Sequence, residues 1–448
     1  MAQETLVHVF WERVQTTPER PAIFHKVAGS FRPVIWREHG RVVELVAGGL
    51  LKAAVMPGEK VAILSNSRPQ WTWSDMAILS AGAVTVPIYP TLAAPEIEYL
   101  LRHSDSVGVI AENQTQVRKL LSLKEPPEGL KFIVVMEGEP PVERLAGVRM
   151  LKWEDLLKDG EVFLPAHPQA LTERIDGISP ETLATIVYTS GTTGVPKGAM
   201  LLHGNLYAVC RALSHFVGFH PDDLGLSFLP LAHVYERVGG QFVAIYEGLI
   251  AAYAESMDTV AQDLVEMRPT ILNGVPRFFE KVYHRIQSEV RQMPKAQQYL
   301  IRWALALGKR AARYKEHTVN GATEIVRKIY RAELRVAERL VFSRIRRRFG
   351  GRVRFMCSGA APLSPDVHLF FETIGIPIIE GYGLTETSAP VTCNTPNGIK
   401  RGTVGRPLPG VEVKIAEDGE IMVRGPNVFA GYYKDEQATR QAFRDGWF

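Results

Sequence analysis

The chain has 448 residues, 46% of them hydrophobic and 22% charged, which is typical of a globular protein long enough for two or more lobes. Its formal net charge of +4 gives no reason to expect a nucleic-acid partner and does not require a membrane. The three cysteines are scattered and form no Cys/His cluster, which argues against a zinc site and for a reducing compartment. Because neither a signal peptide nor an apolar run of about 18 residues is visible, we expect a cytoplasmic protein without a spanning helix.

Short apolar runs alternate with helical patterns through the first half of the chain. The runs that we expect to form buried parallel strands cover residues 60–64, 84–89, 107–111, 132–136 and 183–188. Helices are expected to open near Ser67, which Pro69 follows, and near Pro95. This alternation predicts lobes in which helices cover both faces of a mostly parallel sheet, the doubly wound arrangement.

A long helical and basic segment follows, from about residue 275 to residue 350. Between Lys281 and Gly350 there are 18 Lys and Arg residues against 5 Asp and Glu residues, a local net charge of +13. A helical insert at about 281–350 can simply present a solvated face. It can also attract a polyanionic ligand or anionic lipid headgroups, so peripheral contact with the inner surface of an anionic membrane is an open expectation.

The character of the chain changes again after residue 400. Residues 411–415 and 420–425 flank a turn at Asp418-Gly419, which is the pattern of a β-hairpin. We therefore predict an α/β fold: two doubly wound lobes at about 1–175 and 176–400, the helical insert, and a small antiparallel β lobe at 401–448.

The most informative segment is YTSGTTGVPKG, residues 188–198, which follows an apolar strand and precedes a helix near His203. Its hydroxyls, glycine N–H groups and lysine can form a cradle for phosphate groups. The glycines are wrongly spaced from Lys197 for a Walker A loop, which disfavours a P-loop nucleotidase. The candidate phosphate-binding residues are Thr189, Ser190, Gly191, Thr192, Thr193, Gly194 and Lys197.

This segment resembles the hallmark (S/T)SG(S/T)TGxPKG of the adenylate-forming superfamily, which includes acyl-CoA synthetases, peptide-synthetase adenylation domains and luciferases. The resemblance implies that the loop handles the β- and γ-phosphates of ATP and the departing pyrophosphate. It also implies a catalytic role for Lys197.

A second segment, EGYGLTET at residues 380–387, has two glycines around Tyr382, so that this ring can stand clear of the backbone and stack on a flat base. A polar loop with a helix cap is the structural alternative. The segment resembles the YGxTE motif of the same family, which implies Tyr382 on adenine, Thr385 on the α-phosphate and Glu386 on Mg²⁺. The candidate nucleotide-binding residues here are Glu380, Gly381, Tyr382, Gly383 and Thr385, and the candidate Mg²⁺ ligands are Thr189 and Glu386.

Two further segments complete the predicted site. His233, in SFLPLAHVYE at 227–236, would alone more often be structural, but it resembles the LPxxH position that lies near the reacting carboxylate. The helix expected at 234–246 would then border an acyl pocket. The segment CSGAAPL at 357–363 resembles a loop beside the adenosine, or is only a tight strand–helix turn. We assign Gly359 and Ala360 to the nucleotide, and His233, Val234, Gly274 and Ala361 to the acyl group.

The segment NGVPRFFEKV at 273–282, the basic insert and the flanks of the other motifs together resemble long-chain fatty acyl-CoA synthetases over the whole chain. This resemblance implies that ATP and Mg²⁺ are used to convert a fatty acid to acyl-AMP, with transfer to coenzyme A. The catalytic residues would be Lys197, His233, Thr385 and Glu386. Two other hypotheses stay open: an acyl-AMP ligase or adenylation domain that loads a carrier protein, and a non-catalytic nucleotide- or acyl-binding module.

The family pattern also includes residues that this chain does not have. It continues with a TGD motif, a hinge and a small C-terminal domain with a lysine, whereas this sequence ends at Phe448. The chain resembles the large N-terminal domain alone, and we expect it to bind substrates without efficient turnover. The pattern fixes neither the acyl chain length nor the oligomeric state.

Overall fold

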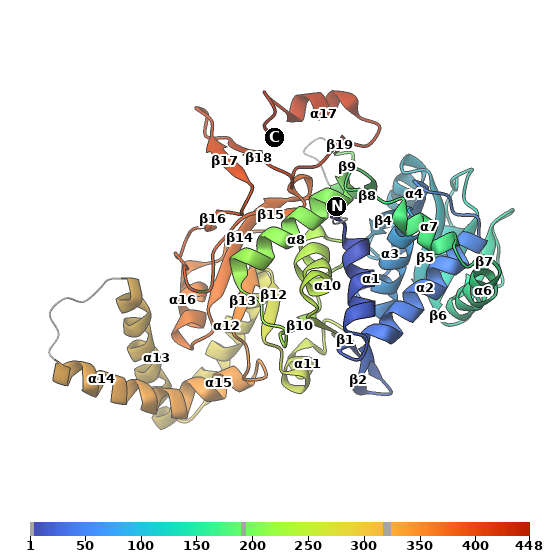
Figure 1. Ribbon diagram of the computed structural model, residues 1–448. Helices are drawn as coiled ribbons and strands as arrows, with labels where there is room; N and C mark the ends of the chain where they lie inside the picture. The colour runs from blue at the N-terminus through green and yellow to red at the C-terminus, as the bar shows by residue number, and fades with distance from the viewer. Residues whose placement is uncertain (1–3, 190–193, 317–323) are drawn as a thin grey trace.

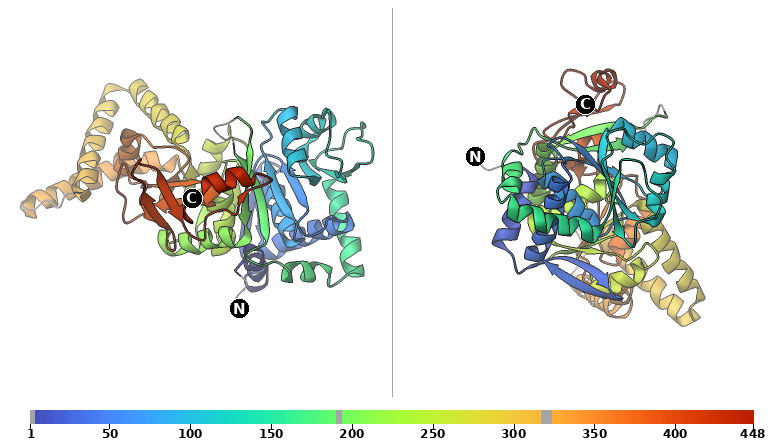
Figure 2. Two further views of the ribbon diagram at one scale, coloured as in Figure 1. Left: turned by 90° about the horizontal axis from the view of Figure 1, so that it is seen from above. Right: turned by 90° about the vertical axis from the view of Figure 1, so that its right-hand side faces the viewer.

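The computed structural model describes residues 4–189, 194–316 and 324–448. Two large sheets stand next to each other with helices around them, and a helical arm projects from the body (Figures 1 and 2). Two mostly parallel sheets and a small antiparallel one confirm the predicted α/β fold class.

The first sheet contains eight strands within the described residues. In spatial order they are β19 (Gly431–Tyr432), β9 (Lys197–Leu202), β8 (Leu183–Thr189), β4 (Val84–Ile88), β3 (Lys60–Leu64), β5 (Ser106–Asn113), β6 (Phe132–Glu137) and β7 (Arg149–Lys152). The strands from β8 to β7 are parallel, and β9 and β19 add an antiparallel edge. All five apolar runs predicted from the sequence are strands of this sheet, because burial on both faces leaves no polar alternation.

The second sheet contains nine strands within the described residues. In spatial order they are β16 (Arg406–Pro407), β15 (Ala389–Cys393), β14 (Ile378–Leu384), β13 (Phe355–Ser358), β12 (Ile271–Gly274), β10 (Leu224–Ser227), β11 (Ile250–Tyr253), β1 (Pro21–Val27) and β2 (Ser30–Ile35). The strands from β14 to β1 are parallel, whereas β2, β15 and β16 pair antiparallel at the two edges.

The two sheets do not follow the boundary expected near residue 175. The early strands β1 and β2 belong to the second sheet, while β8, β9 and the late strand β19 belong to the first. Apolar runs identify buried parallel strands but do not say which strand lies beside which, since crossover connections separate neighbours in sequence. A division into contiguous lobes at 1–175 and 176–400 therefore does not describe how the sheets are built.

Helices cover the sheets on both faces (Figure 1). Up to residue 270 they are α1 (Leu6–Thr16), α2 (Trp36–Lys52), α3 (Pro69–Ser80), α4 (Ala94–His103), α5 (Gln114–Leu121), α6 (Trp153–Ala166), α7 (Ala170–Asp176), α8 (His203–Val217), α9 (Val234–Glu236), α10 (Val243–Glu247) and α11 (Val260–Met267). The helix expected at 234–246 is present but contains a π-helical stretch, η1 (Arg237–Phe242), between α9 and α10.

The basic insert is helical, as predicted, and its outer part projects away from the sheets (Figures 1 and 2). It contains α12 (Pro276–Gln292), α13 (Lys295–Glu316), α14 (Glu324–Ala337), η2 (Glu338–Phe342) and α15 (Ser343–Arg347). The predicted hairpin is β17 (Glu412–Ile415) and β18 (Ile421–Arg424), and α16 (Pro365–Thr373) and α17 (Glu436–Ala442) complete the fold. Across the described ranges, no helix has the length and apolar character needed to cross a bilayer.

A buried ion pair connects the two sheets through their helices. Asp75 on α3 and Arg237 on η1 are 0% and 2% exposed, and two guanidinium nitrogens of Arg237 donate to Asp75 at 2.6 and 3.0 Å. Arg237 also donates to Thr185 on β8 at 2.7 Å, and Gln241 and Thr85 donate to the Asp75 carboxylate at 2.7 and 2.8 Å. Every charge in this network has good partners, which is the condition under which a buried ion pair is tolerated.

Candidate functional site

The predicted phosphate-binding segment begins at the end of β8 and ends at the start of β9. Thr189 and Lys197 are direct partners in the antiparallel pairing of these strands. Gly194 has a φ of +90°, in the left-handed region where glycine is favoured. The predicted residues Ser190, Gly191, Thr192 and Thr193 lie outside the described residues. The described ends of the segment therefore place a hydroxyl residue beside a lysine at one edge of the first sheet.

Lys197 and Glu386 share a partner, Tyr432, on the neighbouring strand β19. The Lys197 ammonium nitrogen lies 5.3 Å from the centroid of the Tyr432 ring, and the Tyr432 hydroxyl donates to Oε1 of Glu386 at 2.8 Å. Burial raises the pKa of Tyr432, so this hydroxyl remains a donor. The sequence predicted Lys197 and Glu386 but not Tyr432, which lies 46 residues after Glu386 and in no motif that we identified.

Thr385 and Glu386 stand in a short turn, η3 (Thr385–Thr387), directly after β14. The backbone N–H of Phe429 donates to the carbonyl oxygen of Glu386 at 2.8 Å, which ties the turn to the C-terminal segment. Ser388 and Ala389 follow with φ of +55° and +85°, values that cost a non-glycine residue about 1–3 kcal/mol each. Strained backbone next to a candidate site is consistent with a turn built to present particular side chains.

The glycines around Tyr382 have a structural reason beside the one expected from the sequence. A Cβ on Gly383 would lie 1.8 Å from the carbonyl oxygen of Ala389, and a Cβ on Gly381 would lie 3.2 Å from the carbonyl oxygen of Thr392. The glycines therefore allow β15 to approach β14 closely. Tyr382 lies between them and is partly exposed.

Glu380 is turned into the protein, where it supports the loop after β13. Its carboxylate is buried and accepts from the backbone N–H of Leu363 at 3.3 Å, and its other oxygen lies 3.1 Å from Nδ1 of His368. Ala360, with a φ of +71°, and Ala361 are exposed on the same loop. Protein groups thus engage both oxygens of the one carboxylate in the predicted nucleotide set.

The small residues Gly359 and Gly274 make room for aromatic rings. A Cβ on Gly359 would lie 3.2 Å from the Tyr235 ring, and a Cβ on Gly274 would lie 2.6 Å from the Phe279 ring. The Tyr235 hydroxyl lies 3.1 and 3.3 Å from the carbonyl oxygens of Cys357 and Gly274. Tyr235 therefore joins the ends of β12 and β13, where the predicted nucleotide and acyl residues meet.

His233 is the N-cap of α9, and its Nδ1 atom accepts from the backbone N–H of Tyr235 at 3.1 Å. Burial lowers the pKa of His233, so the neutral imidazole is favoured. Because Nδ1 is the acceptor, the proton of the neutral ring is on Nε2. The capping bond thus fixes His233 as a hydrogen-bond donor through Nε2.

A mostly apolar cavity of about 40 Å³ lies between the helix after His233 and strands β10, β11 and β12. The predicted acyl residues His233, Val234, Gly274 and Ala361 are not among its lining residues. The helical side is lined instead by Glu236, Gly239, Gly240, Gln241, Val243 and Ala244. The sequence signal for this cavity was the pair of glycines inside a helical pattern, which often marks a packing or functional need.

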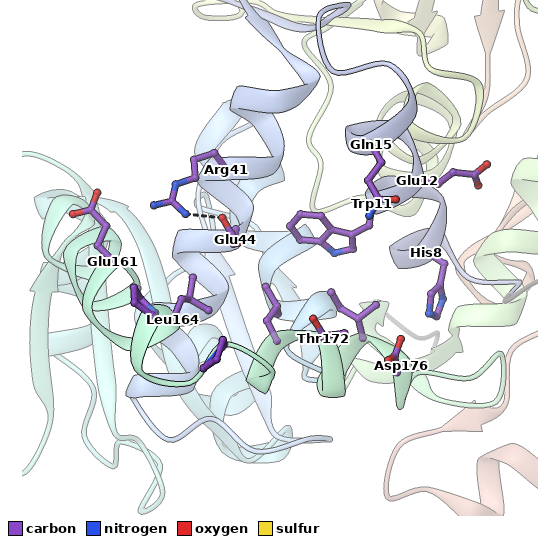
Figure 3. A pocket seen from close by; sticks show the side chains of 15 residues that line it. His8, Trp11, Glu12, Gln15, Arg41, Glu44, Glu161, Leu164, Thr172 and Asp176 are labelled. Carbon is purple, nitrogen blue, oxygen red and sulfur yellow. Dashed lines mark hydrogen bonds and ion pairs between the residues drawn. The ribbon is translucent and has the colours of Figure 1, made fainter.

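A second hollow, of about 700 Å³, lies between α1, α2, α6 and α7 (Figure 3). Apolar side chains such as Trp11 and Leu164 share it with the carboxylates of Glu12, Glu161 and Asp176. None of the predicted site residues that the structure describes lines this hollow. Its volume alone therefore does not make it the candidate site.

Comparison with known proteins identifies the family to which this chain is similar. The family described as AMP-binding enzyme matches residues 10–433. The long-chain-fatty-acid–CoA ligase FadD15 of Mycobacterium bovis is 32% identical over 99% of this chain, and the long chain acyl-CoA synthetase 7, peroxisomal, of Arabidopsis thaliana is 34% identical over 99%. The chain spans 71% and 63% of the lengths of these two relatives.

Solved structures share the fold at low sequence identity. The anthranilate CoA ligase AuaEII in complex with anthranoyl-AMP has a TM-score of 0.75 at 20% identity, over 100% of this chain and 75% of that one. The N-terminal domain of FACL13 from Mycobacterium tuberculosis has a TM-score of 0.69 at 18% identity, over 99% of this chain and 95% of that one. With a family match over most of its length, the chain belongs to the AMP-binding enzyme family of adenylate-forming ligases.

Proposed function

We propose that this chain is the substrate-binding part of a ligase that converts a long-chain fatty acid to its acyl-CoA through an acyl-AMP intermediate. The observation that supports this most is the meeting of Lys197 and Glu386 around Tyr432 at the end of the loop motif. The names of the relatives, which are long-chain fatty acid–CoA ligases and acyl-CoA synthetases, supply the substrate class.

In the first step a fatty acid carboxylate oxygen attacks the α-phosphorus of ATP, forms a new P–O bond and expels pyrophosphate. No protein nucleophile is needed, so the protein contributes position and charge. Lys197 and the loop from Thr189 to Gly194 would neutralise the phosphate oxygens. The His233 Nε2–H would donate to the reacting carboxylate or the α-phosphate, and Thr385 would donate to the α-phosphate.

Thr189 and Glu386 offer oxygen ligands, which suit Mg²⁺. Within the described parts of the chain no group of three His, Cys, Asp or Glu side chains is placed to hold a metal. Mg²⁺ commonly takes one or two protein oxygens together with substrate phosphates, so this donor set fits it. When bound, the ion would neutralise charge that develops on the phosphates.

For the adenine ring of ATP, we propose that Tyr382 stacks on it beside Gly359 and Ala360. Glu380 would not contact the nucleotide but would position the loop that carries Ala360 and Ala361, because its carboxylate holds that loop.

In the second step the coenzyme A thiol would lose its proton, attack the acyl carbonyl carbon and release AMP. Transfer to a carrier protein is the alternative, and turnover with a carrier-bound thiol but not with free coenzyme A would favour it.

Calorimetric measurement of Mg·ATP binding to this chain tests the part of the site proposed to hold the phosphates. We expect Lys197→Ala and Glu386→Gln to weaken binding by about tenfold or more, because each removes charge that the phosphates or their cation require. Lys295→Ala, on the exposed start of α13, is the matched control and should bind as the original chain does. Equal affinity in all four proteins would contradict the proposed site.

We also propose that the basic insert contacts anionic membranes, where long-chain fatty acids reside. On α13, Tyr299 and Trp303 are 69% and 38% exposed, four residues apart on one helical face. The basic residues Arg302, Lys309 and Arg310 are exposed on the same helix. Aromatic and basic side chains together suit the interface of an anionic bilayer.

Sedimentation with lipid vesicles tests this surface. Binding to phosphatidylglycerol vesicles should exceed binding to phosphatidylcholine vesicles and should fall as salt is added. The double variant Lys309→Glu/Arg310→Glu should lose most of the difference, whereas Lys414→Glu on β17 makes the same kind of charge change elsewhere and should keep it. Equal binding to both kinds of vesicle would remove the membrane role.

A further inference from the structure

Glu236 is a buried carboxyl group that the proposed chemistry does not use. It is 2% exposed and lines the apolar cavity behind His233. In the described part of the chain no ion pair to Glu236 is present. The neighbouring cation, Arg237, is directed instead to Asp75. A buried carboxyl group without a cation is costly and calls for an explanation.

The side chain of Glu236 crosses the space between the helix and the second sheet. The Ser227 hydroxyl at the end of β10 donates to Oε1 at 2.6 Å. The Asn273 amide on β12 donates to Oε2 at 3.3 Å. One carboxyl group from α9 is therefore bonded to two strands of the sheet, across the cavity that lies between them.

Two glycines of η1 leave room for this arrangement. A Cβ on Gly240 would lie 2.7 Å from Oε1 of Glu236, and a Cβ on Gly239 would lie 3.7 Å from the Asn273 amide nitrogen. On the opposite wall, a Cβ on Gly225 would meet nothing within 4 Å. Glycines thus stand on both walls of the cavity, and the Glu236 carboxyl group bridges these walls through its hydrogen bonds to Ser227 and Asn273.

The cavity is too small for the proposed substrate while Glu236 lies across it. Its volume of about 40 Å³ holds a few water molecules at most. A long acyl chain entering from the His233 end of the helix must pass Glu236 and widen the space behind it. To do so it must separate the carboxyl group from Ser227 and Asn273.

We propose that Glu236 is the residue that determines how long an acyl chain this domain accepts, acting as a crossbar between α9 and the sheet that long chains must displace. This rests on the proposed function, since it assigns the cavity to the acyl group. Burial raises the pKa of Glu236 to about 7, so the crossbar can move among apolar side chains without carrying a full charge. Short acyl groups end before the crossbar and do not meet it.

The test is calorimetric binding of acetyl-, octanoyl- and palmitoyl-sulfamoyl-adenosine to the original chain, Glu236→Ala and Glu236→Gln. Removing the crossbar in Glu236→Ala should raise the ratio of palmitoyl to acetyl affinity by about tenfold, which corresponds to the roughly 1.4 kcal/mol of the lost hydrogen bonds. Glu236→Gln has the same shape and can still bond to Ser227 and Asn273, so it should keep the original ratio. Ser227→Ala removes one anchor and should give an intermediate ratio.

Three outcomes separate this inference from the function on which it rests. A ratio that rises in Glu236→Ala but not in Glu236→Gln supports the crossbar. Binding of all three ligands with the same ratio in every variant overturns the crossbar and leaves the proposed function standing. Failure of the original chain to bind any of the three ligands overturns both. A thermal unfolding curve for each variant confirms that the protein compared is folded.

Discussion

Two adjacent residues, Glu236 and Arg237, are equally buried, but their surroundings differ in charge. Arg237 faces the first sheet, where Asp75 balances its charge and Thr185 accepts a further hydrogen bond. Glu236 faces the second sheet, where two neutral donors and an apolar cavity surround it. The boundary between the α-helical turn and the π-helical stretch falls between them.

The difference shows how one turn of helix can serve both stability and function. The Asp75 network is fully paired, so it can join α3, β8 and η1 without leaving a charge unmatched. Glu236 has hydrogen bonds but no counter-charge among the residues that the structure describes, which costs stability whenever the group is ionised. A local cost of this kind is expected where a ligand must enter.

The largest expected effect follows from breaking the ion pair between Asp75 and Arg237. Asp75→Ala leaves the Arg237 guanidinium buried without its carboxylate and should lower the free energy of unfolding by about 3–5 kcal/mol. Urea unfolding measures this. Asp222→Ala removes a carboxylate whose side chain is 97% exposed and should change stability by less than about 0.5 kcal/mol. Similar losses for the two variants would show that the buried network does not hold the sheets together.

The contribution of Glu236 to the free energy of unfolding should depend on pH. The unfolded chain releases the Glu236 proton near its ordinary pKa of 4.5, whereas the folded chain holds it until about 7. Stability attributable to this group therefore falls as pH rises from 4.5 to 7 and is constant above. Glu236→Gln cannot ionise, so its stability relative to the original chain should grow by about 2 kcal/mol between about pH 5 and pH 8. A difference that is constant with pH would contradict the unpaired state of Glu236.

Ser227→Ala should produce a smaller effect with the same dependence on pH. The Ser227 hydroxyl donates to Glu236 and lowers its pKa, opposing the effect of burial. Its removal should cost about 1.5 kcal/mol near pH 8, where the carboxylate needs the donor, and less near pH 5. Unfolding in urea at the two pH values, with the exposed Ser256→Ala as control, would reveal an equal loss at both if this assignment is wrong.

Thr85→Val should show the smallest effect on the free energy of unfolding. The Thr85 hydroxyl donates to Asp75 at 2.8 Å, and the remaining donors to that carboxylate, from Arg237 and Gln241, are unaffected. The loss of one of several hydrogen bonds should be about 1 kcal/mol, measured by urea unfolding. A loss as large as that of Asp75→Ala would mean that the remaining donors do not hold the Asp75 carboxylate in place.

The sequence identified those parts of the fold that depend on local pattern. The strand at 60–64 is β3 with the same ends, and the helix near Ser67 is α3, whose first residue is Pro69. Lys197 and Glu386 were predicted because their motifs carry the chemistry of phosphates and cations. The partners of these motifs come from distant segments, such as Tyr432 on β19, and no spacing rule connects them.

Which strands pair in each sheet, and which residues surround the cavity, could not be predicted from the sequence. Membership of β1 and β2 in the second sheet depends on pairing across more than two hundred residues, as in the contact of Ile23 with Ala251. Glu236 stood inside a recognised motif, but its burial without a cation is visible only once helix, β10 and β12 are packed together. His233 was identified, whereas its role as an N-cap that sets the ring's tautomer required coordinates.

The most direct test of the account compares acetyl-, octanoyl- and palmitoyl-sulfamoyl-adenosine with AMP as ligands of the 448-residue chain, using calorimetry. We expect AMP and all three acyl forms to bind, with an affinity that rises from acetyl to palmitoyl because the longer chain buries more apolar surface in the cavity behind His233. Affinity highest for acetyl, or no binding by any of the four ligands, would contradict an adenylate site joined to a pocket for a long acyl chain.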